Sequence, residues 1–282
     1  MKLAPRFGDP RALEVAPDVM VDPATPNVRQ RQRFTEVLAS LDDDGWAAPT
    51  RCEGWSVQDV VAHLTTANQL WTFSIGQGLE GEPSRFLVDF DPVATPAALV
   101  DAARSQSPAQ TFDEFVATGD ALTEVLSQVD GDAWDLSAEA PPGHLPIRAV
   151  VLHALWDAWT HERDVAFPLG LPVTLEPDEI TGSLVYAAAL GPTFLALQGS
   201  TREGTLEVAA TDPDVRFTIE LGPTVRVVSG PAPSGTPVLA GDAVALVEGL
   251  SFRAPMPVEL PDDERWLLGS LGTVFDDPVI GA

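Results

Sequence analysis

The chain has 282 residues, of which 42 are acidic and 16 are Lys or Arg, so its formal net charge is −26. This charge argues against nucleic acid and an anionic membrane surface as partners, because both recruit cationic side chains. Hydrophobic residues make up 45% of the sequence, enough for one large or two modest domains. A single cysteine, Cys52, excludes an intrachain disulfide. We find no signal peptide and no run of about 18 uninterrupted apolar residues, and therefore expect a cytoplasmic protein.

Helical periodicity dominates the first two thirds of the chain. Residues 1–26 are rich in proline and lack periodicity, so we interpret them as an N-terminal arm on the surface. Apolar residues then recur at helical spacing, and caps, prolines and glycines mark where helices end. The predicted helices span about 27–41, 57–75, 107–129, 147–166 and 176–198, with a short helix after residue 95 and loops at 76–96 and 130–146.

The pattern changes after Gly199. Short apolar segments separated by turns predict strands at 205–210, 215–221 and 225–228, with a further strand after the turn at 230–237. Helices are predicted at about 241–249 and 262–272. The sequence therefore predicts a helical domain over 27–200 and a small α+β domain over 201–282.

Two histidines and one aspartate have a spacing that suits a metal site. Asp157 and His161 lie four residues apart on one predicted helix, so their side chains project from the same face. His63 lies on another predicted helix and can supply a third ligand, as facing helices do in helix bundles. Three protein ligands with one open position is the arrangement of catalytic zinc sites. Spacing alone leaves ordinary core or surface roles open for all three residues.

Two segments of the sequence resemble the signatures of a known family. The first reads Pro-Thr-Arg-Cys-Glu-Gly-Trp-Ser-Val-Gln-Asp-Val-Val-Ala-His-Leu over 49–64, and the second Leu-Trp-Asp-Ala-Trp-Thr-His-Glu-Arg-Asp-Val-Ala-Phe-Pro-Leu-Gly over 155–170. Together they resemble the mycothiol-dependent maleylpyruvate isomerase family, within the DinB-like superfamily of metal-binding four-helix bundles. The resemblance implies an up-down-down-up four-helix bundle followed by a small α+β sterol-carrier-like domain.

The resemblance also implies a set of site residues. A divalent metal, with zinc as the first candidate, would be held by His63, Asp157 and His161, and mycothiol would be the co-substrate. The isomerases carry Glu at the middle ligand position, so Asp157, one methylene shorter, is a departure that should shift the metal. In the isomerases an arginine of the C-terminal domain helps to bind the substrate carboxylate. Arg253 matches that arginine by position, and Arg226 is the second candidate.

Two further histidines are catalytic candidates beside Arg253. His153 lies one turn before Asp157 and is a fourth ligand, an acid or base, or a packing residue. His144 lies in a predicted loop rich in Pro and Gly, next to the helix with the ligand candidates, and is a substrate contact or an exposed loop histidine.

Cys52 and the residues after His161 each have two interpretations. Cys52 could be a nucleophile, but no histidine is close enough in sequence to activate it, which favours packing against Trp55. The segment 162–164 offers either a carboxylate that orients the His161 imidazole or a salt-bridged helix end. The resemblance favours the helix-anchoring role for Arg163 and Asp164.

We therefore expect a metal-dependent thiol transferase or isomerase that acts on a small electrophile. Two alternatives stay open. A thiol-independent metalloenzyme, such as a hydrolase, a lyase or another tailoring enzyme of secondary metabolism, would need the metal but no thiol. A non-enzymatic protein would bind an apolar ligand. A monomer is plausible because the small domain can cap the bundle, and a homodimer stays open.

Overall fold

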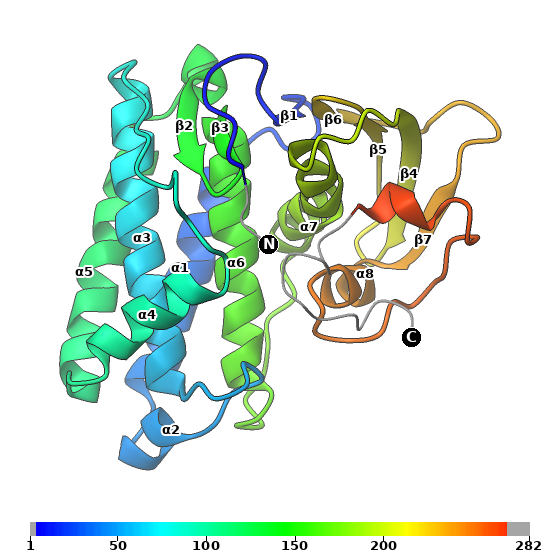
Figure 1. The fold of residues 1–282 in the computed structure, drawn as a ribbon. Coiled ribbons are helices and arrows are strands. Elements are labelled where there is room, and N and C mark those ends of the chain that lie inside the picture. The colour runs from blue at the N-terminus through cyan, green and yellow to red at the C-terminus, as the bar shows by residue number, and fades with distance from the viewer. Residues whose placement is uncertain (1–3, 270–282) are drawn as a thin grey trace.

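The computed structural model describes residues 4–269, which form a helical part and a part built around a mixed sheet (Figure 1). Four long helices run side by side in the helical part: α1 (Ala24–Ala39), α3 (Val57–Leu79), α5 (Pro108–Leu126) and α6 (Ile147–Ala166). The short helices α2 (Asp43–Ala47) and α4 (Ala94–Ala103) lie beside α3. Because α3 packs directly on α6, the two signature segments meet inside this part.

The second part contains a five-stranded sheet with strand order β1-β6-β5-β4-β7. Strands β4 (Gly204–Thr211), β5 (Val215–Leu221) and β6 (Val225–Ser229) pair antiparallel in sequence order, whereas β7 (Val238–Asp242) returns parallel to β4. Helix α7 (Pro177–Leu197) packs against both α6 and the sheet, and α8 (Ala243–Leu250) packs on α7. The expected change from helices to a mixed α and β region near residue 200 is thus confirmed.

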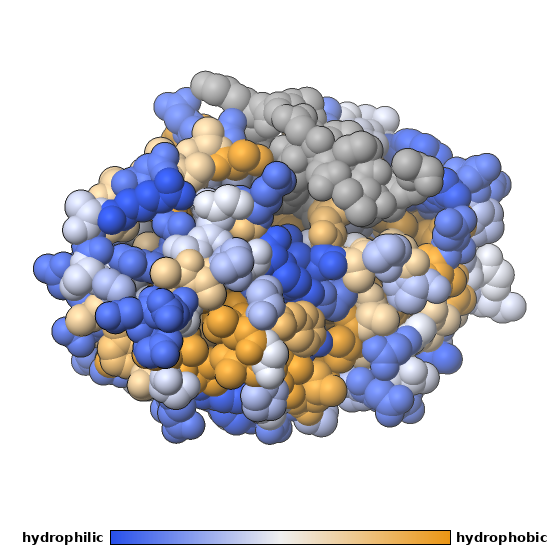
Figure 2. All heavy atoms as spheres, turned by 90° about the horizontal axis from the view of Figure 1, so that it is seen from below, coloured by the Kyte–Doolittle hydropathy of each residue, from blue (hydrophilic) through white to orange (hydrophobic). Residues whose placement is uncertain are grey.

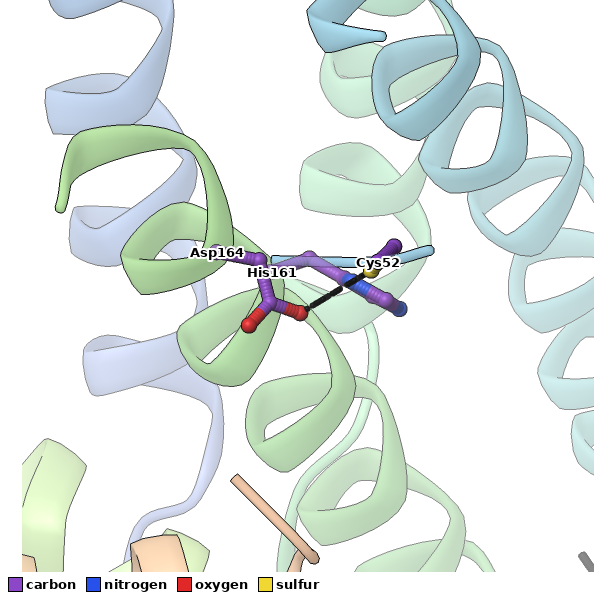
Figure 3. A group of neighbouring side chains, drawn as sticks. All are labelled: Cys52, His161 and Asp164. Atoms are coloured by element: carbon purple, nitrogen blue, oxygen red, sulfur yellow. Dashed lines mark hydrogen bonds and ion pairs between the residues drawn. The ribbon is translucent and has the colours of Figure 1, made fainter. Parts of the chain in front are cut away.

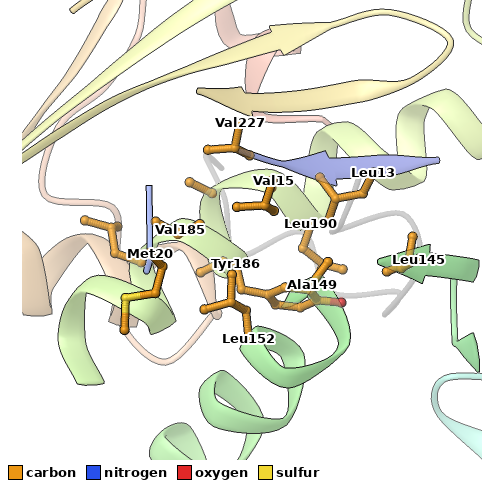
Figure 4. Packing of buried hydrophobic residues seen from close by; sticks show 14 of the residues in the cluster. Leu13, Val15, Met20, Leu145, Ala149, Leu152, Val185, Tyr186, Leu190 and Val227 are labelled. Carbon is orange, nitrogen blue, oxygen red and sulfur yellow. The ribbon is translucent and has the colours of Figure 1, made fainter. Parts of the chain in front are cut away.

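The N-terminal arm is part of this sheet. Strand β1 (Leu13–Val15) pairs parallel with β6, so Leu13 lies opposite Val225 and Val15 opposite Val227. The Leu13 side chain is fully buried, and it packs with α6 and α7 residues in the main core (Figure 4). The expectation of a surface arm is wrong for this strand, because three residues are too few for an alternation signal and the partner strand lies far along the chain.

The predicted loop at 130–146 is also structured. It holds a 3-10 turn (Gly131–Asp135) and a hairpin of β2 (Ser137–Ala140) and β3 (Gly143–Pro146). Gly143 has φ +109°, and a Cβ there would lie 2.0 Å from the Arg6 carbonyl oxygen, so only glycine fits. Periodicity does not predict this hairpin, because each strand has only four residues and two prolines lie between them. The last predicted helix appears only as the 3-10 turn Arg265–Leu268, and its end lies outside the described residues.

Local signals position the two helices that matter for function. Ser56 caps α3 in a capping box with Asp59, each side chain accepting a hydrogen bond from the other residue's backbone N–H. Helix α6 begins at Ile147 and ends at Ala166, as the periodicity predicts. These boundaries determine which faces of α3 and α6 meet.

Helix α7 is, within residues 4–269, the helix that is long and apolar enough to cross a membrane. Of its most apolar stretch, 83% is buried inside the fold, as in the core helix of a globular protein. The face seen from below carries both hydrophilic and apolar residues, and the largest group of apolar residues lies in its lower middle (Figure 2).

Candidate metal centre

The three expected ligands come together between α3 and α6. Nε2 of His63 and Nε2 of His161 each lie 3.6 Å from Oδ1 of Asp157, and the two imidazole ring centroids are 4.9 Å apart. One donor atom from each residue can be chosen so that all lie within 4.8 Å of one another. The side chains of His63, Asp157 and His161 are 16%, 15% and 11% exposed, so the cluster is mostly buried but in partial contact with solvent.

These donors suit a divalent ion. Two ligands at about 2.1 Å from a tetrahedral zinc lie about 3.4 Å apart, close to the 3.6 Å found between Asp157 and each histidine. Burial raises the pKa of Asp157. The neighbouring His63, His161 and His153 lower it by more than burial raises it, so the pKa ends well below its usual range. Asp157 is therefore an anionic ligand at neutral pH, and His/carboxylate sets bind several divalent metals.

The other nitrogen of His161 is held by Asp164. Nδ1–H donates to Oδ2 of Asp164 at 3.0 Å, which leaves the Nε2 lone pair for the side that faces Asp157. Cys52 lies on the same side, with its thiol donating to Asp164 Oδ2 at 3.2 Å and Sγ 3.6 Å from His161 Nδ1 (Figure 3). The orienting carboxylate considered from the sequence is thus present beside His161, although the resemblance favoured helix anchoring alone.

Cys52 does not have the surroundings of a nucleophile. Burial, assisted by the Asp164 carboxylate, raises the pKa of the Cys52 thiol to about 12, although Arg253 opposes the rise. A histidine does lie close in space, which the sequence order concealed. However, His161 directs its Nδ1 proton to Asp164, so it does not act as a base for the thiol.

His153 lies one turn before Asp157 on α6, inside an aromatic cluster. Its ring stacks on Tyr186 of α7 with centroids 4.6 Å apart and lies 4.7 Å from Trp71 and 5.6 Å from Trp156. Nδ1 shares a hydrogen bond of 2.7 Å with the Tyr186 hydroxyl. Burial lowers the pKa of His153 to about 4, so the imidazole is neutral at pH 7. The structure therefore places His153 one helical turn from Asp157, as an uncharged member of this aromatic cluster.

His144 does not join the cluster. It is buried in β3, where its Nδ1 accepts from the Gly8 backbone N–H at 3.0 Å and its Nε2–H donates to the Ser84 carbonyl at 2.8 Å. Both nitrogens are used by backbone groups, and Phe7 packs edge-on against the ring. The expected catalytic role does not fit these contacts. Through them His144 links the hairpin to the N-terminal arm at Gly8 and to the loop at Ser84.

The two arginine candidates have different surroundings. Arg253 follows α8 and reaches the cluster from the C-terminal part, but its Nε and Nη2 donate to Asp164 at 2.9–3.0 Å. Arg226 lies on β6, is 57% exposed and pairs with Glu14 at 3.4 Å. The structure therefore brings Arg253 to the ligand helix and leaves Arg226 on the sheet surface.

Sequence comparison identifies the segment that contains the cluster. Residues 28–166 match the family model described as the mycothiol maleylpyruvate isomerase N-terminal domain. This part of the chain belongs to that family. The matched segment of the mycothiol maleylpyruvate isomerase family includes His63, Asp157, His161 and Asp164, whereas Arg253 lies beyond it.

The chain is also similar to curated proteins and to solved structures. An uncharacterized protein of Mycobacterium tuberculosis is 25% identical over 175 residues, covering 62% of this chain and 82% of the relative. A second uncharacterized protein of that organism is 29% identical over 140 residues, 48% of this chain and 51% of the relative. The crystal structure of the mycothiol-dependent maleylpyruvate isomerase has a TM-score of 0.59 at 17% identity and covers 85% of this chain and 94% of that chain. At this identity the likeness shows the fold.

Arg51 and Glu248, which lie beside the centre, escaped prediction because only tertiary packing places them there. Arg51 donates to Asp164 at 2.9 Å and to Glu248 of α8 at 2.7 Å, and Arg163 also donates to Glu248 at 2.7 Å. Glu162 points the other way, accepting from Arg33 of α1. The alternating charges at 162–164, near the end of α6, were the available signal in the sequence. They did not indicate which residues these side chains would pair with.

Proposed function

We propose that this protein is a metal-dependent thiol transferase or isomerase that uses mycothiol to act on a small electrophilic substrate. The observation that carries the proposal is the convergence of His63, Asp157 and His161 in a segment that belongs to the mycothiol maleylpyruvate isomerase family. The solved isomerase with the same fold supports it. We extend the proposal to an up-down-down-up DinB-like bundle and a sterol-carrier-like C-terminal domain, in a cytoplasmic monomer or homodimer.

Each residue of the centre has a part in this function. His63, Asp157 and His161 would hold the divalent ion, with zinc as the first candidate. A bound divalent ion supplies a lowered pKa for a coordinating thiol, which makes the thiol nucleophilic at neutral pH. Asp164 keeps the proton of His161 on Nδ1 and so keeps Nε2 free to bind.

The surroundings of the centre favour a planar or apolar portion of the substrate. Trp55 lies against His63 with ring centroids 5.5 Å apart, and His153 extends the aromatic surface on the other helix. His153 carries no charge at pH 7, so it orients a substrate by packing and hydrogen bonding rather than by ion pairing.

The first experiment measures metal content in protein purified without chelator or His-tag, for the wild type and for His63→Ala and Asp157→Ala. We expect about one divalent ion per chain in the wild type and a loss of most of it in both variants. Thr66→Ala, one turn along α3, serves as the matched control and should keep the metal. A wild type without metal, even after supplementation, contradicts the proposal.

A second experiment distinguishes the thiol enzyme from its alternatives. Metal-loaded protein is incubated with an electrophile and with mycothiol, another small thiol or no thiol. Turnover that requires mycothiol and is lost in His63→Ala supports the proposal. Metal-dependent turnover without thiol indicates the thiol-independent metalloenzyme. Binding of an apolar ligand that is unchanged in His161→Ala, without turnover, indicates the binding protein.

A further inference from the structure

The C-terminal part touches the candidate metal centre through one buried carboxylate. Asp164 is fully buried on α6, and its Oδ2 accepts the Nδ1 proton of His161 at 3.0 Å. Arg253 donates to both oxygens of the same carboxylate, from Nε at 2.9 and 3.0 Å and from Nη2 at 2.9 Å. We propose that Arg253 is a positioning residue, which holds Asp164 and thereby sets the orientation of His161 in the metal centre. This inference rests on the proposed function.

The turn that carries Arg253 is built to hold its side chain at that position. Phe252 adopts φ +58°, a left-handed conformation that is unfavourable for a bulky residue. Hydrogen bonds from Arg253 N to Glu248 O at 2.8 Å and from Arg253 Nη1 to Ser251 O at 3.3 Å close the turn. Such strain persists where the surroundings hold it in place, and here it directs the guanidinium toward α6.

The same turn contacts α6 on both sides of the ligand pair. Ser251 Oγ accepts from Nε1 of Trp156 at 2.8 Å, next to Asp157, while Arg253 binds Asp164 three residues after His161. Two fixed points on one helix restrain both its rotation and its position. The C-terminal part therefore restrains the helix segment that carries Asp157 and His161.

The geometry argues against a direct contact between Arg253 and a substrate carboxylate. Nε and Nη2 donate to Asp164 and Nη1 donates to the Ser251 carbonyl, so each of the three guanidinium nitrogens already has a protein acceptor for one of its N–H groups. Arg253 also lies on the Nδ1 side of His161, whereas the cluster with Asp157 is formed by Nε2. The arginine is thus on the side of the imidazole away from the candidate ligand position.

Zinc affinity tests this inference independently of turnover. Arg253→Ala is compared with the wild type by competition with a chelating dye at fixed pH, and the visible spectrum of the cobalt-loaded protein reports the ligand geometry. We expect a loss of about 10–100-fold in zinc affinity and a changed cobalt spectrum, as for other residues that orient a metal-binding histidine. Arg253→Lys should recover part of the affinity, because lysine keeps the charge but not the two-point contact.

Two further variants complete the design. Arg226→Ala removes an exposed arginine of β6, in the same C-terminal part, and should leave zinc affinity unchanged. If Arg253→Ala does not fold, Asp164→Asn provides the test, because the amide keeps the volume but loses the charge that accepts from His161; we expect weaker zinc binding there too. The inference is overturned, and the proposed function is not, if folded Arg253→Ala binds zinc with wild-type affinity, has an unchanged cobalt spectrum and shows a raised KM for a carboxylate substrate. A wild type that binds no metal would overturn the proposed function as well.

Discussion

His153 and Tyr186 share a hydrogen bond of 2.7 Å between Nδ1 and the hydroxyl, and their rings stack with centroids 4.6 Å apart. This pair joins α6 to α7 one turn from Asp157, where α7 in turn supports the sheet. Both side chains are buried, and burial raises the pKa of Tyr186 while it lowers that of His153. The pair is therefore uncharged across the physiological pH range and connects the ligand helix to the C-terminal part without an ion pair.

The buried neutral His153 predicts a specific acid dependence of stability. Its pKa of about 4 lies below the ordinary value of 6.5, so between these values the unfolded chain binds the proton that the folded chain excludes. The stabilising effect is present above pH 6.5 and is lost as pH falls toward 4, by roughly 3 kcal/mol in total. Between pH 7 and pH 5 we expect His153 to account for about 2 kcal/mol of the loss in unfolding free energy.

Urea unfolding of the wild type and His153→Phe at pH 7 and pH 5 measures this contribution. Phenylalanine keeps the aromatic packing but does not titrate, so the variant should lose less stability on acidification than the wild type. Equal losses in the two proteins would show that the histidine is not held neutral in the folded state.

Cys52 is expected to be unreactive despite its partial exposure. With a pKa of about 12, its thiolate fraction at pH 8 is about a thousandfold below that of an ordinary cysteine. Iodoacetamide should therefore modify the native protein at least a hundredfold more slowly than the urea-unfolded protein. Cys52→Ser serves as the unlabelled control and should keep metal-dependent activity, because the serine hydroxyl can also donate to Asp164. Fast alkylation of the native state would reopen a nucleophilic role.

His144→Ala should destabilise the protein without affecting the centre. The substitution removes two hydrogen bonds to backbone groups, Gly8 N–H and Ser84 O, and opens a cavity in a buried position. We expect a loss of about 2–4 kcal/mol in unfolding free energy and unchanged metal content. Loss of turnover in a variant of normal stability would instead place His144 at the substrate.

Leu13 tests whether the N-terminal strand belongs to the core. Leu13→Ala should cost about 2–4 kcal/mol, because the side chain is fully buried between the sheet and the helices. Val21→Ala, at a site 78% exposed in the same arm, is the matched control and should change stability by less than about 0.5 kcal/mol. Urea midpoints compare the two, and similar small effects would mean that the arm only lies on the surface.

The parts of the structure that sequence predicted well depend on local patterns. The bounds of α6 and the Ser56 cap follow from periodicity and capping chemistry, which involve neighbours within one or two turns. The grouping of His63 with Asp157 and His161 was also expected, since a family resemblance aligned two helices that periodicity alone cannot place together. Their role as ligands stays a prediction.

The parts that sequence did not predict depend on contacts between distant segments. Strand β1 has no signal of its own and exists because β6 offers an edge. The target of Arg253 is set by the turn at Phe252 and by the packing of α8, neither of which leaves a pattern in the sequence. The sequence predicts His144 in a loop, as a substrate contact or an exposed residue, because the hairpin and the arm that bury it are both too short to recognise.

The pairing of β1 with β6 has a consequence for biosynthesis. Leu13 leaves the ribosome early, but its partner Val225 is translated only after the whole helical part. The first strand must therefore wait, unpaired, while most of the helical part is made and can already fold. A chain released too early would expose Leu13 and Val15 as an open edge, so we expect truncated products to be targets for chaperones and proteases. Pairing of β1 therefore becomes possible only after β6 has been translated.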